Sequence, residues 1–396
     1  MKNSLHYIAL LLTICCLTGC TEQYALQSTD FESALVVEAT LTNELKFHEV
    51  KLSRTFRLEE DGPQFEADAS VSILASDGAV YDFVEANGIY RSVDAFRAEP
   101  DKTYRLRIAT SDGKIYSSRA ETLTTPTQLE DVVASVGTVN DVLGITINAK
   151  SFDPANTSKY YRYTFAETYK IIAPYWTPFK AIRVPTGGEF DGIDIVPRTN
   201  GESKTCFKTV FSTDIIQTST NELLEDRVDF TVRFIAKNDP IITHRYSILV
   251  TQYVQSHAAY MFYKTLKELS GQGSILSQNQ PGFFYGNLRN EAQPAEKVIG
   301  FFEVASASSQ RIYFNYTDLF PGEQLPPYFV DCSPNSFKFC FIPTDFECRG
   351  AALLSMISTN QLLYFADEGL YYFMVPPSCG DCNYIGSNIV PSFWQD

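Results

Sequence analysis

Hydrophobic and polar residues alternate along the chain from residue 35 to residue 118. A period of two is typical of strands that bury one face and expose the other. Asp-Gly, which is typical of tight hairpin turns, occurs at residues 77–78 and 112–113, each time between two alternating segments. These features predict an immunoglobulin-like β-sandwich over residues 34–125, which we expect to fold on its own. Its strands are predicted at residues 35–39, 49–53, 69–74, 80–84, 88–92, 103–108 and 114–118.

The pattern changes at Thr124-Thr125-Pro126, where we place a domain boundary. Residues 126–396 are predicted to form a larger β-rich domain with longer and more aromatic strands. One inserted helix is predicted near residues 256–270, because Ser256 can cap it and apolar residues recur on one helical face. We expect that face to pack against the core. The strands are predicted at residues 144–149, 160–169, 229–236, 246–254, 300–305 and 311–316.

The C-terminal part, after residue 275, is rich in loops and prolines and contains most of the cysteines. An even number of cysteines in an exported protein favours disulfides, so we predict three bridges that staple this region, with the pairing left open. Cys379 and Cys382 have the CxxC spacing that redox and zinc sites share, and these sites remain alternatives. A second CxxC pair, which a zinc ribbon needs, is absent from the sequence. The six disulfide candidates are Cys206, Cys332, Cys340, Cys348, Cys379 and Cys382.

The first twenty residues are typical of a bacterial lipoprotein signal. A positive charge precedes an apolar run over residues 7–17, which is too short for a transmembrane helix. Leu17-Thr18-Gly19-Cys20 then matches a lipobox. We therefore predict a signal peptide over residues 1–19, lipid attachment at Cys20 and a tether over residues 20–33, so that lipid holds the protein on the membrane. An ordinary secretory signal is the alternative.

The chain is acidic, with 32 basic and 47 acidic residues and a formal net charge of −15 at pH 7. Phosphate contacts need basic patches, so this charge argues against nucleic acid as a partner. It also argues against electrostatic docking on anionic lipids. We therefore expect the membrane anchor to be the lipid and not the charge of the protein surface.

The sequence offers little that is typical of catalysis. His48, His244 and His257 lie in no metal-binding motif, and the sequence contains no nucleophile elbow, phosphate loop or dinucleotide fingerprint. We therefore predict no catalytic residue, no metal site and no cofactor. An envelope hydrolase, with carboxylates that converge from distant positions, remains a third hypothesis.

One aromatic segment is bracketed by two prolines. Pro174 and Pro178 disfavour a central strand, so Tyr175, Trp176 and Phe179 are expected on a loop. There they are candidates for contact with a ligand or a partner protein. The alternative is that these aromatic side chains fold back onto the sheet as part of its core.

Short motifs follow one another in a distinctive order along the chain. They are Leu35-Val36-Val37-Glu38, Leu41-Thr42-Asn43-Glu44, Val50-Lys51-Leu52-Ser53-Arg54-Thr55, Gly88-Ile89-Tyr90, Tyr104-Arg105-Leu106, Asp112-Gly113-Lys114-Ile115-Tyr116-Ser117-Ser118, Tyr160-Tyr161-Arg162-Tyr163, Glu167-Thr168-Tyr169, Tyr260-Met261-Phe262-Tyr263, Gly286-Asn287, Gly300-Phe301-Phe302, Cys379-Gly380-Asp381-Cys382 and Pro391-Ser392-Phe393-Trp394. Their order and spacing resemble the Bacteroidota outer-membrane lipoproteins catalogued as domain of unknown function 4249. The resemblance covers nearly the whole mature chain.

The resemblance implies a location and a role more than a reaction, because the family has no settled activity and supplies no catalytic residues. Its members are often encoded beside TonB-dependent transporters, which implies a non-enzymatic outer-membrane protein that assists such a β-barrel in nutrient capture. The ligand class, whether glycan, peptide or metal chelate, stays open. A structural or assembly protein of the cell envelope is the alternative. Thr21 fits the outer membrane, and Glu22, the single acidic residue among residues 21–24, leaves the membrane face undecided.

Overall fold

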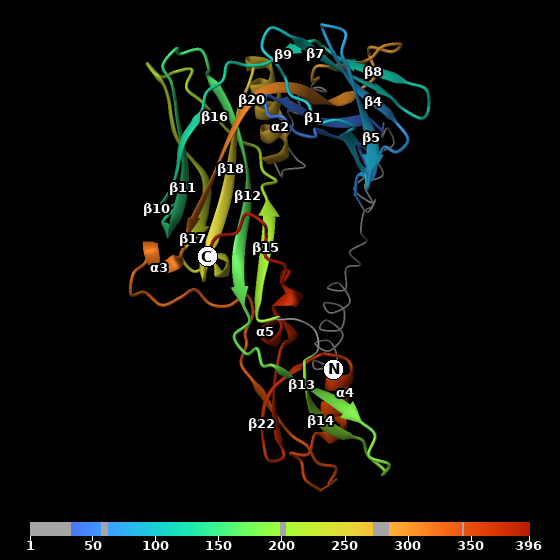
Figure 1. The fold of residues 1–396 in the computed structure, drawn as a ribbon, viewed down its shortest axis with the longest axis vertical. Coiled ribbons are helices and arrows are strands. Elements are labelled where there is room, and N and C mark those ends of the chain that lie inside the picture. The colour runs from blue at the N-terminus through green and yellow to red at the C-terminus, as the bar shows by residue number, and fades with distance from the viewer. Residues whose placement is uncertain (1–32, 57–61, 199–202, 272–284, 343) are drawn as a thin grey trace, which may run out of the picture.

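The computed structural model describes residues 33–56, 62–198, 203–271, 285–342 and 344–396. The predicted signal peptide, Cys20 and residues 20–32 of the predicted tether lie outside these ranges. The described chain is mainly β, which confirms the predicted fold class. It forms three modules: the first lies beside the upper end of the second, and the third lies at the lower end of the molecule (Figure 1). We call them the N-terminal module, the central sandwich and the distal module. None of the helices in the described ranges combines the length and apolarity that crossing a membrane requires.

The N-terminal module forms because each predicted strand turns one apolar face to a common core. In β1, Leu35, Val37, Ala39 and Leu41 are buried, and the residues between them are less so. All the predicted strands of this region are present, within a few residues of their expected bounds. The module contains β1 (Leu35–Thr42), β2 (Glu49–Arg54), β3 (Gln64–Phe65), β4 (Ser70–Ala75), β5 (Val80–Ala86), β6 (Ile89–Ser92), β7 (Thr103–Ala109), β8 (Ile115–Ser118) and β9 (Glu121–Thr122).

Two strands from far along the chain complete this module. β19 (Leu288–Asn290) pairs with β8, and the first half of β20 (Val298–Phe314) pairs in parallel with β1. Local alternation does not reveal such pairing, because a parallel partner is always distant in sequence. The domain predicted over residues 34–125 therefore lacks part of the module's sheet and core. The buried core residues that come from these two strands are Leu288, Val298, Phe302 and Val304.

Close backbone contacts fix β20 against β1. Gly300 has a φ of +149°, and a Cβ there would lie 2.3 Å from the carbonyl oxygen of Val37. Asn287 contacts β20 through both ends of its amide: Nδ2 donates to the carbonyl oxygen of Phe302 (2.8 Å), and Oδ1 accepts from the Phe302 N–H (2.8 Å). The amide thus takes the place of a strand partner. Gly300 and Asn287 both belong to motifs that carry the family resemblance.

The central sandwich consists of two packed sheets. One has the order β15-β12-β18-β20, with β16 also paired to β12, and the other has the order β10-β11-β17. β20 is a single strand of 17 residues, whereas the sequence predicted two strands there. Residues 300–307 are buried throughout, so the alternation of a half-exposed strand is missing. The other strands are β10 (Leu129–Val139), β11 (Val142–Asp153), β12 (Tyr160–Ile172), β15 (Thr205–Phe211), β16 (Ile216–Ser219), β17 (Asp226–Ala236) and β18 (Tyr246–Val254).

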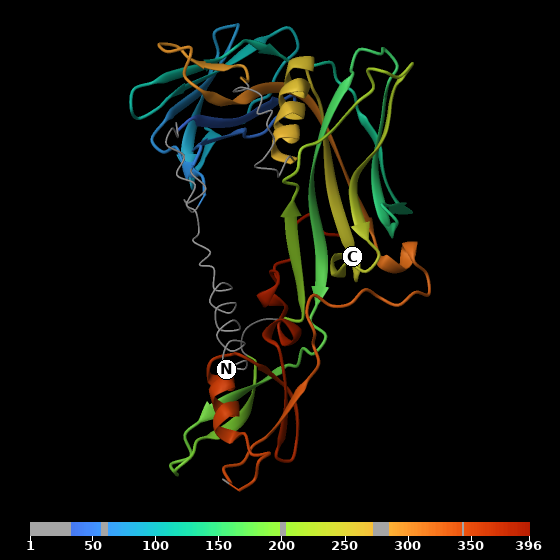
Figure 2. The ribbon, with the colours of Figure 1, turned by 180° about the vertical axis from the view of Figure 1, so that it is seen from behind.

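Short helices border the central sandwich. The predicted helix is α2 (His257–Gly271), which lies between the N-terminal module and the central sandwich (Figure 2). Its Ala259 and Phe262 pack against Phe301 of β20, as expected for the apolar face. The other two are η1 (Pro240–Ile242) and α3 (Tyr316–Leu319).

The distal module is assembled from two separate parts of the chain. The hairpin of β13 and β14 is inserted between β12 and β15, and the rest of the module follows β20. The hairpin packs against α4 and against a sheet of order β21-β23-β22, over the buried residues Leu353, Ile357, Tyr364 and Met374. The elements are β13 (Phe179–Val184), β14 (Gly192–Pro197), β21 (Asn335–Lys338), α4 (Gly350–Ser358), β22 (Leu363–Glu368), β23 (Tyr371–Val375), α5 (Pro377–Gly380) and η2 (Cys382–Tyr384).

Three disulfides connect the C-terminal part of the chain. Cys340 is bonded to Cys348, Cys332 to Cys379, and Cys206 of β15 to Cys382. Each cysteine of the CxxC motif is therefore bonded to a partner outside the motif. The arrangement fits loops held by cross-links and leaves no dithiol for redox exchange in the motif.

Candidate functional site

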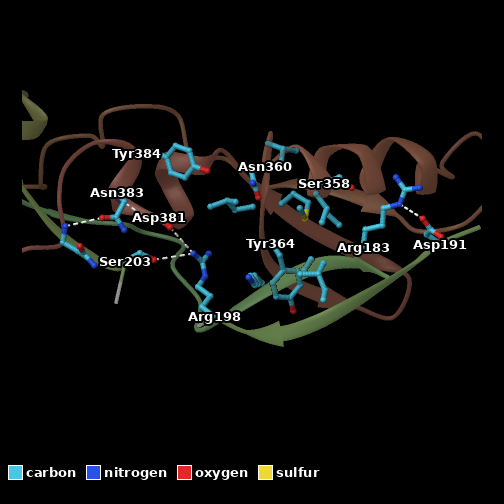
Figure 3. Close-up of a pocket in the computed structure, with 18 of the residues that line it drawn as sticks. Arg183, Asp191, Arg198, Ser203, Ser358, Asn360, Tyr364, Asp381, Asn383 and Tyr384 are labelled. Carbon is cyan, nitrogen blue, oxygen red and sulfur yellow. Dashed lines mark hydrogen bonds and ion pairs between the residues drawn. The ribbon is translucent and has the colours of Figure 1, made fainter. Parts of the chain in front are cut away.

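A pocket of about 780 Å³ opens in the distal module, between the β13–β14 hairpin and the C-terminal segment (Figure 3). One wall is β13, and the opposite wall is formed by the end of α4 and the start of β22. The floor is formed by Arg198, Ser203 and the segment from Asp381 to Asn388. The volume falls in the range of roughly 300–1,000 Å³ that is usual for ligand sites.

Arg198 holds one end of the pocket together. Its Nη1 lies 3.4 Å from Asp381 Oδ2 and donates to Ser203 Oγ (3.4 Å). Its Nη2 donates to the carbonyl oxygen of Gly380 (3.3 Å), and its Nε donates to that of Phe179 (3.2 Å). A guanidinium suits this position because it presents several donors in one plane. Since Arg198 follows β14 directly, these bonds tie the hairpin to the CxxC segment.

The remaining charges of the pocket lie on or near β13. Arg183 Nε and Asp191 Oδ2 are 2.5 Å apart at the end opposite Arg198 (Figure 3). Lys180 also lines the pocket, and among the described residues it has no ion-pair partner. Both acidic residues of the lining are thus paired with arginines, and one cation is left over.

The side of the pocket that faces the distal core is apolar. Ile357, Leu363 and Met374 line it, and Tyr364 is only 9% exposed. Burial and then the hydrogen bond from its hydroxyl to Asp367 raise the pKa of Tyr364 to about 12, so the hydroxyl stays protonated at neutral pH. Uncharged amides provide further polar groups, at Asn360, Asn383 and Asn388.

The three aromatic residues singled out in the sequence lie beside this pocket and do not line it. Tyr175 packs edge-on against Phe365, with ring centroids 4.8 Å apart. Trp176 packs against the core of the central sandwich, and its buried Nε1 has no hydrogen-bond partner among the described residues. Phe179 is 43% exposed at the start of β13. Trp176 thus packs against the core, as in the alternative given above. A contact role for Tyr175 and Phe179 stays a prediction.

Neither Arg198 nor Lys180 is a residue that the sequence alone would single out. Neither lies in a motif, and each gains its position only when a hairpin inserted after β12 meets the C-terminal segment. Asp381 carried a signal, because it is the acidic residue inside the CxxC motif. Its structural use is to pair with Arg198 and to accept from the Asn383 N–H at the start of η2.

A wider hollow of about 1,370 Å³ lies in the angle between the N-terminal module and the central sandwich. Arg162 lines it and lies 2.7 Å from Glu303, between the rings of Tyr253 (4.4 Å to the centroid) and Tyr263 (5.0 Å). Burial alone would lower the pKa of Arg162, but Glu303 and the two tyrosines raise it. These groups come from β12, β18, β20 and α2, so the cluster holds the module junction together.

One cluster of potential metal ligands occurs among the described residues: Cys340, Asp345 and Cys348. The two sulfur atoms are bonded to each other, so neither is the thiolate that zinc requires. The cluster is therefore better explained as a disulfide-closed loop, in which Asp345 pairs with Lys338 (2.6 Å).

The chain matches a known protein family over most of its length. A sequence model described as "Domain of unknown function (DUF4249)" matches residues 21–311. No curated protein matches. A solved structure titled "Biofilm associated protein - B domain" is 9% identical, covers 70% of this chain and 85% of that chain, and has a TM-score of 0.15. That score is too low to carry an argument.

Proposed function

The chain belongs to the DUF4249 family, and we propose that it is a lipid-anchored binding protein of the outer membrane. It assists a TonB-dependent transporter in nutrient capture and catalyses no reaction. The family description assigns no activity, so the proposal rests on the lipobox, on the gene neighbourhood that the family implies, and on the pocket in the distal module.

The state of the charges in the pocket carries the proposal. Both acidic residues of the lining are engaged by arginines, Asp191 by Arg183 and Asp381 by Arg198. A general base needs a carboxylate or imidazole that is free to accept a proton from a substrate. A pocket with paired charges, uncharged amides and an apolar wall is better suited to holding a ligand than to transforming it.

The lipobox supports the proposed location. Cys20 is the predicted site of lipid attachment, and two or more acyl chains give stable anchoring. The N-terminal module follows the predicted tether directly, and the distal module lies at the other end of the long axis (Figure 2). The pocket is therefore far along the molecule from the module to which the anchor connects.

Purification from native membranes tests the proposal. Tagged protein, extracted in mild detergent, is expected to bring down a β-barrel transporter that mass spectrometry identifies. The control is Cys20→Ala, which should accumulate as an unprocessed precursor, take up no labelled fatty acid and bring down no transporter. A lipidated protein that repeatedly purifies without any β-barrel would contradict the transporter role.

A structural or assembly protein of the envelope is the second candidate, and the tip of the distal module favours it. Phe190, Ile342 and Phe346 are 45%, 55% and 89% exposed there. Exposed apolar side chains of this size are typical of protein contacts. Recovery of envelope scaffold proteins in place of a transporter would support this candidate, and hydrolysis of a glycan or peptide panel would support an enzyme.

A further inference from the structure

The wall of the pocket that β13 forms is a strand edge. Four consecutive residues, from Lys180 to Arg183, line the pocket. A strand that presented one face would contribute alternate residues only, because successive side chains point to opposite faces. β13 is paired with β14 on one side, and no strand of the described chain pairs with its other side. The lining is therefore the open backbone edge of β13.

The hydrogen-bond pattern of the hairpin identifies the groups at this edge. The Arg198 N–H donates to the Pro178 carbonyl oxygen, so this pair is a hydrogen-bonded one. In antiparallel strands such pairs alternate with pairs whose backbone groups point outward. Counting along the register from Pro178 places the N–H and C=O of Ala181 and Arg183 at the open edge. In the described structure neither residue makes a backbone hydrogen bond there.

The first outward carbonyl of the edge is occupied. The Phe179 carbonyl oxygen accepts from Arg198 Nε, at the end of the pocket that Arg198 closes. The free part of the edge thus starts at Ala181 and ends where the Arg183–Asp191 pair lies. This length suits a short extended segment, and an unpaired edge is a template for another strand.

The charges of the pocket favour one kind of ligand. The acidic side chains of the lining are already paired, and Lys180 is the cation without a partner among the described residues. The lining carries two arginines and one lysine against two aspartates, so its formal charge is positive although the chain as a whole carries a net charge of −15. A ligand carboxylate would complement it. Leu362 and Leu363, which are half-buried on the opposite side, would contact apolar ligand side chains.

We infer that this pocket binds a short free peptide, which lies extended beside β13 as an added strand and places a carboxylate near Lys180. Main-chain hydrogen bonds to Ala181 and Arg183 provide affinity, as in other cases of β-strand addition. The inference rests on the proposed binding function and names the ligand class of that site.

A pentapeptide library with free C-termini tests the inference. The library is incubated with the detergent-purified full chain, bound peptides are identified by mass spectrometry, and the affinity of the best peptide is measured by fluorescence anisotropy. Ala181→Pro removes one outward N–H without removing a bond to β14, and it should weaken binding about tenfold. N-methylation of the peptide backbone should weaken binding to the unaltered protein by a similar factor.

The matched control is Val136→Pro on the edge strand β10. Val136 is 45% exposed, and its register within the β10–β11 hairpin also turns its N–H outward. This variant should bind the peptide like the unaltered protein. A C-terminal amide on the peptide separates its two sources of carboxylate: weaker binding assigns the contact to the terminus, and unchanged binding that Lys180→Gln still weakens assigns it to an acidic side chain.

The contrary results are distinct from failure of the proposed function. Enrichment of no peptide, or equal affinity for the N-methylated peptide, would overturn the peptide inference even if a transporter co-purifies. Binding of an oligosaccharide panel in place of peptides would do the same, as would a pocket filled by a segment of a co-purified protein. If Ala181→Pro does not fold by circular dichroism, the N-methylated peptide still decides. Peptide binding without any transporter would instead contradict the proposed role and keep the ligand class.

Discussion

The N-terminal and distal modules are stabilised in different ways. The N-terminal module has twenty-one buried residues in its core cluster and none of the disulfide cysteines. The distal module has four buried core residues, and two disulfides lie within the C-terminal segment that builds it. A small core stabilises a fold only weakly, so cross-links matter more there. Regular alternation in the sequence thus marks the module that is stabilised by its core, and closely spaced cysteines mark the module that depends on cross-links.

The largest expected effect comes from cutting the N-terminal module at the boundary that the sequence suggests. A fragment of residues 34–125 lacks Leu288, Val298, Phe302 and Val304. Full burial of four such side chains contributes roughly 6–12 kcal/mol, which is comparable to the whole stability of a typical domain. We expect the fragment to show no cooperative thermal transition by circular dichroism, whereas the intact chain should show one. Cooperative unfolding of the fragment would mean that its own strands suffice.

The second effect concerns the distal module. Cys332→Ala together with Cys379→Ala opens a loop with a sequence separation of 47, which by loop entropy should destabilise the module by about 4 kcal/mol. Hydrogen exchange should accelerate in α4 and β22 and stay unchanged in β1 to β8.

The short loop closed by Cys340 and Cys348, with a separation of 8, provides the matched control for this variant. Its removal should destabilise the module by only about 2.5 kcal/mol. Thiol counting on the unaltered protein under denaturing, non-reducing conditions should find all six cysteines oxidised. If hydrogen exchange changed equally in all modules after either substitution, the distal module would not depend on its disulfides more than the other modules do.

The features that could be predicted from the sequence belong mainly to the N-terminal module, where the core is built from alternating strands. The strands of the N-terminal module were predicted because each buries alternate residues, as Tyr104, Leu106 and Ile108 do in β7. The role of β20 was not predicted. Its residues 300–307 are all buried and therefore show no period of two, and its parallel partner β1 is more than two hundred residues away in sequence. Tertiary pairing of this kind leaves no local trace.

The candidate site was harder to predict from the sequence than the fold. Arg198 contacts Asp381 across 183 residues of sequence, and Lys180 lines a pocket whose opposite wall comes from α4 and β22. In addition, hairpin β13–β14 has no strict alternation of buried residues. The aromatic segment around Trp176 was singled out from composition, but the pocket beside it is lined by a backbone edge, amides, paired charges and an apolar side to which that segment does not contribute. Composition does not report which backbone groups stay unpaired, because pairing is decided by the assembled sheet.

A third, smaller effect is that the stability of the two modules should depend differently on pH. Burial lowers the pKa of His48 in the N-terminal module from its ordinary value near 6.5 to about 4. The folded module therefore prefers the neutral ring, while the unfolded chain takes up a proton near pH 6.5. Stability is fully present above pH 6.5 and falls as the pH drops towards 4, by about 3 kcal/mol in total. The distal module has no histidine and should not respond over this range.

Chemical unfolding at pH 7 and pH 4.5, followed by hydrogen exchange, measures this difference. His48→Gln should reduce the loss in the N-terminal module, at the expense of a lower stability at pH 7, because the contact of His48 Nε2 with the Phe96 carbonyl oxygen (2.9 Å) is altered. If the distal module lost stability in parallel with the N-terminal module, burial of His48 would not be the cause.

The smallest effect tests whether the distal module depends on directed polar contacts besides its cross-links. Arg198→Lys keeps the charge but cannot donate to Asp381, Ser203, Gly380 and Phe179 together, since an ammonium lacks the planar fork. The side chain of Arg198 is 13% exposed, so we expect a loss of about 1.5 kcal/mol, measured as faster hydrogen exchange in β13 and β14.

Arg183→Lys is the matched control, because Arg183 lines the same pocket but its side chain is 51% exposed, and a solvent-exposed pair contributes on the order of 0–1 kcal/mol. Hydrogen exchange in the hairpin should therefore change little in this variant. Equal exchange in the two variants would mean that core and disulfides alone hold the hairpin in place. A larger change for Arg198→Lys would mean that the end of the pocket is built by the same contacts that attach the hairpin. The geometry of the ligand site and the stability of the distal module would then depend on one side chain.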